Sequence, residues 1–106
     1  MAFDPICGDG TAYAVREAIL ASAVIRAAIQ GTRPEELLAH YEARLTAGFR
    51  RHLWQCKQFY ESGGSGSWWA SELDQLQRGL DWCDERVGPN FAFRYRLKGF
   101  DLEATR

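Results

Sequence analysis

The chain has 106 residues, of which 46% are hydrophobic and 13% aromatic, and its 13 basic and 14 acidic residues leave a net charge of −1 at pH 7. This length and composition are typical of one globular domain, and a near-neutral chain lacks the field that draws proteins to nucleic acid or anionic lipid. We therefore expect neither nucleic acid nor a membrane as its main partner. The cysteines Cys7, Cys56 and Cys83 show no paired spacing, and the N-terminus lacks the basic and apolar regions of a secretory signal, which predicts a cytoplasmic location.

The chain is expected to begin with a loop over residues 1–10, because a proline and several glycines there disfavour a helix. A helix follows over about residues 11–30 and ends at Gly31. Most of its circumference is apolar, which predicts that more than half of it is buried, and its charged residues make it unsuited to a bilayer. Glu17 falls inside the apolar arc, where an unpaired carboxylate is costly. We expect Glu17 either to form a salt bridge with a neighbouring helix or to mark a site.

Two further helices are predicted by apolar residues that recur at steps of three and four. The first covers about residues 34–61, with a proline at its first position and two acidic residues in its first turn. Gly48 lies in its middle, where it costs about 1 kcal/mol relative to alanine, and therefore indicates a close approach or a bend. After a turn rich in glycine and serine, a third helix begins between Ser67 and Ser71. Ser71 heads a sequence that resembles a capping box, and Gly88 and the proline after it end this helix.

The C-terminal tail changes period. Residues 91–98 alternate between aromatic or apolar and small or basic side chains, a pattern that is typical of a strand. No other segment is predicted to pair with it, so the tail is expected to pack as coil or to find its partner on another chain or in further sequence. The predicted fold is therefore all-α: one domain of three antiparallel helices with a short extended C-terminal tail.

Few side chains suggest chemistry on their own. His52 and Cys56 lie four residues apart and are close enough to share a metal ion, but a structural metal site needs further ligands, and none is predicted nearby. We expect a solvated histidine beside a core cysteine, and no metal. His40 lies on a different side of the same helix. Cys7 precedes a helix N-terminus, an environment that lowers the pKa of a thiol, yet without a histidine base it is expected to be a small loop residue.

The opening stretch resembles the last FAD-contacting motif of flavin-dependent monooxygenases of the p-hydroxybenzoate hydroxylase type. Their tryptophan halogenase-like and geranylgeranyl reductase-like relatives share this motif. It reads Pro-x-x-Gly-x-Gly and is followed, seven residues after the second glycine, by an acidic residue and an alanine. In this chain Pro5, Gly8 and Gly10 match the first part, and Glu17 and Ala18 match the second.

The resemblance implies a set of FAD contacts made by the loop and the helix N-terminus, namely Pro5, Gly8, Asp9, Gly10 and Thr11. Such a terminus would stabilise the negative charge of a reduced flavin. The G-x-G-x-x-G dinucleotide fingerprint and the Gly-Asp motif of the family are absent from this sequence. We therefore expect the C-terminal part of a halogenase-like FAD-dependent oxidoreductase, inactive by itself, whose partner is a missing N-terminal FAD-binding domain. Met1 would then be an internal methionine of the longer protein.

Two alternatives remain open. The chain can be a stand-alone helical interaction module that buries the helix of residues 11–30 and the aromatic tail against a second copy of itself or another partner. It can also be a metal or redox module that uses Cys7, Cys56 and His52. No catalytic residues can be assigned in any of these cases.

Overall fold

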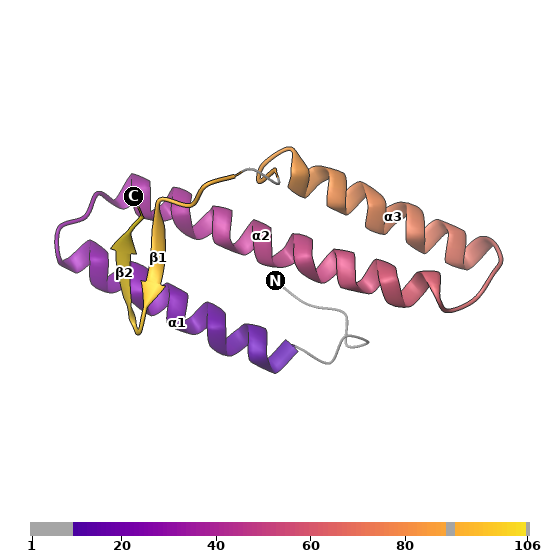
Figure 1. Cartoon of the computed structure of the whole chain (residues 1–106), viewed down its shortest axis with the longest axis horizontal. Coiled ribbons are helices and arrows are strands. Elements are labelled where there is room, and N and C mark those ends of the chain that lie inside the picture. Colours follow the sequence, from indigo (N-terminus) through magenta and orange to yellow (C-terminus); the bar gives the residue numbers. More distant parts are fainter. Residues whose placement is uncertain (1–9, 89–90, 106) are drawn as a thin grey trace.

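The computed structural model describes residues 10–88 and 91–105, in which three helices precede a two-stranded hairpin (Figure 1). The elements are α1 (Gly10–Ile29), α2 (Pro34–Glu61), α3 (Ser67–Asp84), β1 (Tyr95–Lys98) and β2 (Asp101–Ala104). Helix α2 is central: α1 packs along its first half, α3 along its second half, and the hairpin returns to the end that holds α1. The radius of gyration is 16.1 Å, against about 13 Å for a compact chain of this size. The predicted all-α arrangement of three helices with an extended tail is confirmed.

The boundaries of α1 and α2 follow from local chemistry, as predicted. Gly31 adopts a φ of 102°, which lets the chain leave α1 in a left-handed turn. The N–H groups of Gly31 and Thr32 donate to the carbonyl oxygens of Ala28 and Ala27, at 3.1 and 3.0 Å. Arg33, which is extended, is the N-cap of α2, and Pro34 is its first residue. Proline is favourable there because the first N–H group of a helix has no partner within the helix.

Helix α3 begins at Ser67, within the predicted range of Ser67 to Ser71 but one turn before the predicted capping box. Its N-cap is Gly66, with a φ of 116°, so Ser71 lies inside the helix and does not cap it. The reason is tertiary packing, because the indole of Trp69 lies against Gly63 and Gly64 of the preceding turn. The helix ends at Asp84, four residues before Gly88, the predicted end.

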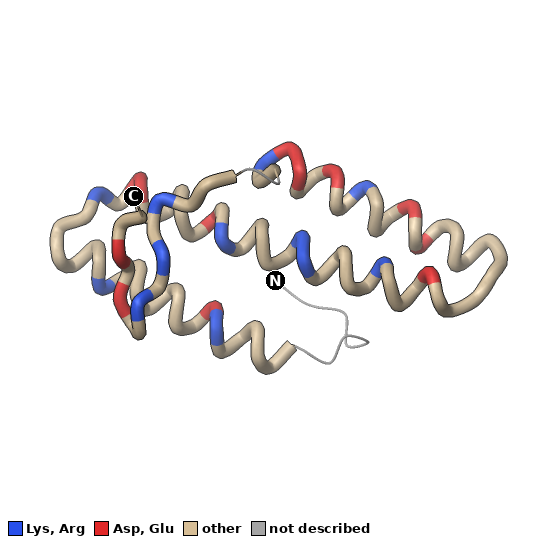
Figure 2. The backbone as a smooth tube through the Cα atoms, in the orientation of Figure 1, with Lys and Arg blue, Asp and Glu red and all other residues tan. Residues whose placement is uncertain are grey.

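The C-terminal tail pairs with itself, so the prediction that this chain offers it no partner is wrong. Strands β1 and β2 are antiparallel and are joined through Gly99, whose φ is 64°. Arg96 stands opposite Glu103 and donates to its carboxylate at 3.0 Å. Figure 2 shows the basic residues of β1 beside the acidic residues of β2. Opposite charges across the pair, together with Leu97 opposite Leu102, stabilise this hairpin.

The core is small and follows α2. Its buried hydrophobic members are Tyr13, Leu20, Ala23, Ala27, Leu37, Cys56, Leu80, Cys83 and Val87. Helices α2 and α3 approach closely at Gly79, where a Cβ would lie 2.8 Å from Cδ1 of Leu53. At Gly48 a close approach or a bend was predicted; a Cβ there would meet nothing within 4 Å, so the close approach is wrong. Gly48 instead borders a cavity.

Candidate functional site

The predicted FAD contacts are described only in part. Outside the described residues lie Cys7 and the predicted contacts Pro5, Gly8 and Asp9. Gly10 and Thr11 are the first two residues of α1, and both are exposed. The first turn of α1, which begins at Gly10, contains no acidic residue.

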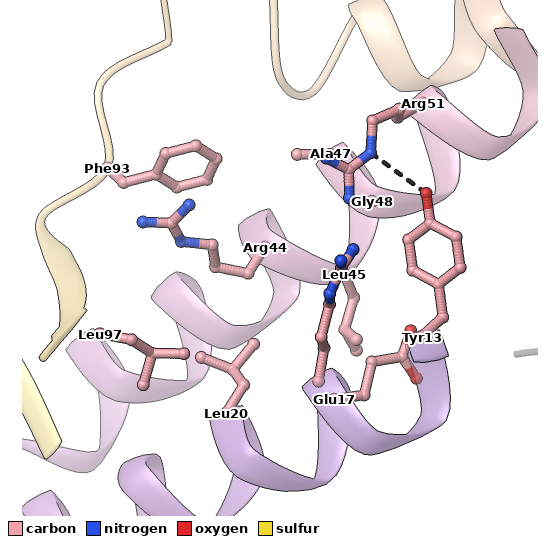
Figure 3. Close-up of a pocket in the computed structure, with 11 residues that line it drawn as sticks. Tyr13, Glu17, Leu20, Arg44, Leu45, Ala47, Gly48, Arg51, Phe93 and Leu97 are labelled. Carbon is pink, nitrogen blue, oxygen red and sulfur yellow. Dashed lines mark hydrogen bonds between the residues drawn. The ribbon is translucent and has the colours of Figure 1, made fainter. Parts of the chain in front are cut away.

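A cavity of about 370 Å³ lies between α1, α2 and the segment that leads into β1 (Figure 3). The apolar side chains that line it include Leu20, Leu45, Phe93 and Leu97. Its polar lining consists of Tyr13, Arg16, Glu17, Arg44 and Arg51. An apolar hollow with a few convergent polar groups is the usual form of a small-molecule site.

Arg44 forms one side of this cavity and is held by the tail. Its guanidinium carbon lies 3.8 Å from the ring centroid of Phe93, and its Nη2 donates to the carbonyl oxygen of Tyr95 at 3.0 Å. Burial lowers the pKa of Arg44, since the charged form loses part of its hydration. The cation is thus fixed in place against an aromatic face.

Arg51 and Tyr13 form the other side of the cavity (Figure 3). Nε of Arg51 donates to the hydroxyl of Tyr13 at 3.1 Å. The guanidinium carbons of Arg51 and Arg16 lie 5.4 and 5.8 Å from the ring centroid of Tyr13. Two cations therefore flank one aromatic ring at this side.

Glu17 is half-buried in the lining of the cavity. Within the described parts of the chain, neither Glu17 nor any of the three cavity arginines has an oppositely charged group within 4.0 Å. The predicted salt bridge of Glu17 to a neighbouring helix is therefore not formed among these residues. Three arginines and one glutamate give the lining a net charge of +2. Glu17 does line the cavity, and the expectation that it marks a site stays a prediction.

No protein-family model, no curated protein and no solved structure matches this chain. Its function is therefore inferred from the residues and their geometry.

The side of α1 that faces away from α2 is a second candidate site. The buried residues of α1 are Tyr13, Leu20, Ala23 and Ala27. The opposite side carries an uncovered row, here called the outer stripe, of Val15, Ala18, Ser22, Ile25 and Ile29. Its three large members are 55%, 59% and 81% exposed, in chain order. The prediction that more than half of this helix is buried is wrong for the described chain, because α2 and the hairpin cover one side only.

His52 and Cys56 are both buried, and Nε2 of His52 lies 3.4 Å from Sγ of Cys56. The core cysteine is confirmed, but the predicted solvated histidine is wrong. The ring of Tyr13 meets His52 edge to face at 6.4 Å, so α1 covers it. The described residues contain no group of three or more side chains able to hold a metal ion.

His40 is also buried, on the side of α2 that the tail covers. It is 4% exposed, and the rings of Phe93 and Tyr95 meet it edge to face at 6.2 and 5.2 Å. Neither ring nitrogen has a hydrogen-bond partner among the residues described. Burial, and then the charge of Arg44, lower the pKa of His40. The burial of His40 was not predicted, because the tail was not expected to fold back over α2.

No helix in the described ranges is long and apolar enough to cross a membrane.

Proposed function

We propose that this chain is a helical association module, in which the outer stripe of α1 packs against the same stripe of a second copy. The observation that carries the proposal is the exposure of Val15, Ile25 and Ile29, at 55%, 59% and 81%, on one side of one helix. Full burial of each such side chain is worth about 1.5–3 kcal/mol. A helix that is apolar on both sides is normally buried on both sides.

A second copy suits the stripe for three reasons. Its members recur at steps of three and four along the 20 residues of α1, the spacing of a helix–helix seam. The stripe carries no charge, so two copies can meet without repulsion. Ala18 and Ser22 are small and lie in its middle, which lets two helices approach closely. An isologous dimer, in which both chains use the same surface, is the commonest closed assembly.

The hairpin extends this surface. Arg26 at the edge of the stripe forms an ion pair of 3.1 Å with Asp101 of β2. This contact brings the hairpin turn beside α1, as Figure 1 shows. Phe100 in that turn is 63% exposed. The proposed interface thus includes part of the tail as well as the helix.

The test compares the native chain with two charge variants in analytical ultracentrifugation. Ile25→Glu places a carboxylate in the proposed seam and is expected to weaken dimerisation by at least about 100-fold, because an unpaired buried charge is costly. Gln75→Glu adds the same charge at an exposed position of α3 and is expected to leave the dimer intact. Equal association of the Ile25→Glu variant and the native chain would exclude the outer stripe as the interface.

A second candidate is the function that the resemblance implies, the C-terminal part of a halogenase-like FAD-dependent oxidoreductase. The observation that favours it is the start of α1 at Gly10, where the motif needs a helix N-terminus. The outer stripe would then be covered by an FAD-binding domain. The FAD contacts would be Pro5, Gly8, Asp9, Gly10 and Thr11.

This second candidate predicts that the isolated chain does not bind free FAD more tightly than about 10 µM, which a fluorescence titration measures. In a longer protein that contains the chain, Gly10→Val is expected to release flavin because a branched side chain blocks close approach of the backbone. Retention of flavin at native stoichiometry by that variant would exclude the proposed contacts.

A further inference from the structure

We propose that the cavity between α1, α2 and the segment before β1 binds an apolar monocarboxylate, a molecule with one carboxylate on an aromatic or alkyl body. Nothing in the association of two chains requires this cavity. It is lined by the inner side of α1, which carries Tyr13 and Leu20, whereas the outer stripe lies on the opposite side. A ligand and a second copy can therefore be bound at once.

The apolar part of the lining predicts that the body of the ligand is hydrocarbon. Leu20, Leu45, Phe93 and Leu97 present hydrocarbon surface from three separate segments of the chain. The volume of about 370 Å³ lies in the range of about 300–1,000 Å³ that is usual for small-molecule sites. Gly48 leaves open space in this wall, since a Cβ there would meet nothing within 4 Å.

The arginines of the lining predict that the ligand carries a carboxylate. Arg44 is fixed by Phe93 and by a hydrogen bond from Nη2, which leaves Nε and Nη1 without a partner among the described residues. Arg51 donates from Nε to Tyr13, and its terminal nitrogens likewise make no hydrogen bond within the described ranges. Planar guanidinium groups with free N–H donors match the geometry of a carboxylate. Arg44 is a fixed, half-buried cation and Arg51 an exposed one, and neither has a counter-ion within 4.0 Å among the described residues, so an anionic ligand would stabilise both.

The carboxylate of Glu17 favours a ligand with one negative charge over a ligand with two. With its carboxylate ionised, the lining carries a net charge of +2. A second negative charge on the ligand would lie near Glu17 and against apolar walls, where it is poorly solvated. A monoanion with an apolar body therefore fits better than a phosphate.

The experiment titrates the intact, isotope-labelled chain with 2-naphthoate and with octanoate, and follows the backbone amides of the lining by NMR. We expect saturable shifts at residues of the cavity with a Kd below about 1 mM for at least one acid. The matched amides, 2-naphthamide and octanamide, are expected to bind at least about tenfold more weakly, because they lack the charge that the arginines recognise. Absence of saturation with both acids, equal binding of acid and amide, or tighter binding of inorganic phosphate would each overturn the proposal.

Three variants locate the site. Arg51→Gln is expected to weaken binding of the better acid at least about fivefold, whereas Arg78→Gln, an exposed arginine of α3, leaves it unchanged. Gly48→Leu directs a side chain into the open space and is expected to abolish binding without lowering the melting temperature. Glu17→Gln removes the opposing charge and is expected to tighten binding about threefold. Native affinity in both Arg51→Gln and Gly48→Leu would place any binding elsewhere and contradict the assignment.

Discussion

The guanidinium carbon of Arg44 lies 3.8 Å from the ring centroid of Phe93, and the same side chain donates to the carbonyl oxygen of Tyr95 at 3.0 Å. One residue of α2 thus holds both the segment before β1 and the first residue of β1. A two-stranded hairpin is only marginally stable by itself, so its position depends on such contacts to the helices. The same contact shapes the cavity and covers His40.

Replacement of Arg44 by methionine is expected to loosen the tail. Methionine keeps most of the hydrocarbon but loses the cation–π contact and the hydrogen bond, which together are worth about 1–3 kcal/mol. Hydrogen exchange is expected to quicken at the amides of β1 while those of α3 stay protected. Arg78→Met serves as the control, because the side chain of Arg78 is 78% exposed and pairs with Asp74 of its own helix. Unchanged exchange in β1 would show that the hairpin is held by other contacts.

His40 makes the stability of the fold depend on pH. Burial, aided by Arg44, lowers its pKa in the folded chain, whereas the unfolded chain keeps a value of about 6.5. Stability is therefore full above about pH 6.5, and it decreases below that pH because the unfolded state takes up the proton first. The loss levels off once the pH falls below the folded-state pKa. Glu35, Glu36 and Arg94 border the same hollow as His40, and Glu36 and Arg94 form an ion pair of 3.9 Å that partly offsets their charges.

His40→Leu tests this account by urea unfolding between pH 5 and pH 7.5. The variant removes two ring nitrogens that lack hydrogen-bond partners among residues 10–88 and 91–105, and it is expected to gain about 1 kcal/mol at pH 7. The difference in unfolding free energy between variant and native chain should widen as the pH falls. Because both chains contain His52, this difference reports the contribution of His40 alone. A constant difference across this range would contradict the lowered pKa.

Gly48→Ala is expected to stabilise the protein by about 0.5–1 kcal/mol, because alanine favours the helix and its Cβ meets nothing within 4 Å. The urea midpoint measures the change. A destabilised variant would mean that a neighbouring segment approaches Gly48 more closely than this structure shows.

Gly64→Ala should act in the opposite direction. The indole of Trp69 occupies the space that a Cβ at Gly64 would need. We expect a loss of about 1–3 kcal/mol from this overpacking. Gly64→Ala combined with Trp69→Ala should show a smaller additional loss than Gly64→Ala alone, since the clash is then absent. Strict additivity of the two changes would contradict the contact.

Much of the fold follows from local patterns in the sequence. The bounds of α1 and α2 were predictable to within a residue, because the apolar spacing is bracketed by Gly31 and by the proline that opens α2. The start of α3 at Ser67 falls within the predicted range of Ser67 to Ser71, but the predicted capping box at Ser71 is not used, and Trp69 packs on the preceding turn. The strand pattern in the tail was visible, but its partner β2 has four residues and no apolar alternation, so only the cross-strand charges mark it.

The cavity was predictable only in part. Glu17 stood out as a lone acidic residue in an apolar arc, and it does line the cavity. Arg44 and Arg51 were harder to predict as cavity residues. The only sign in the sequence is that they lie seven residues apart, which places both on one face of α2. Their role depends on the contact between Arg44 and Phe93, which lie far apart in the sequence. A contact of this kind produces no repeating pattern of residues from which it could be predicted.

The most direct test of the proposed association is the mass of the native chain by sedimentation equilibrium, over a range from about 1 to 200 µM, which brackets the affinities of moderate homodimers. We predict a concentration-dependent shift from the 12.0 kDa monomer to a species of twice that mass. A mass of 12.0 kDa at every concentration would contradict the proposal that α1 docks on a second copy. The outer stripe would then need a different protein surface, such as the FAD-binding domain that the resemblance implies.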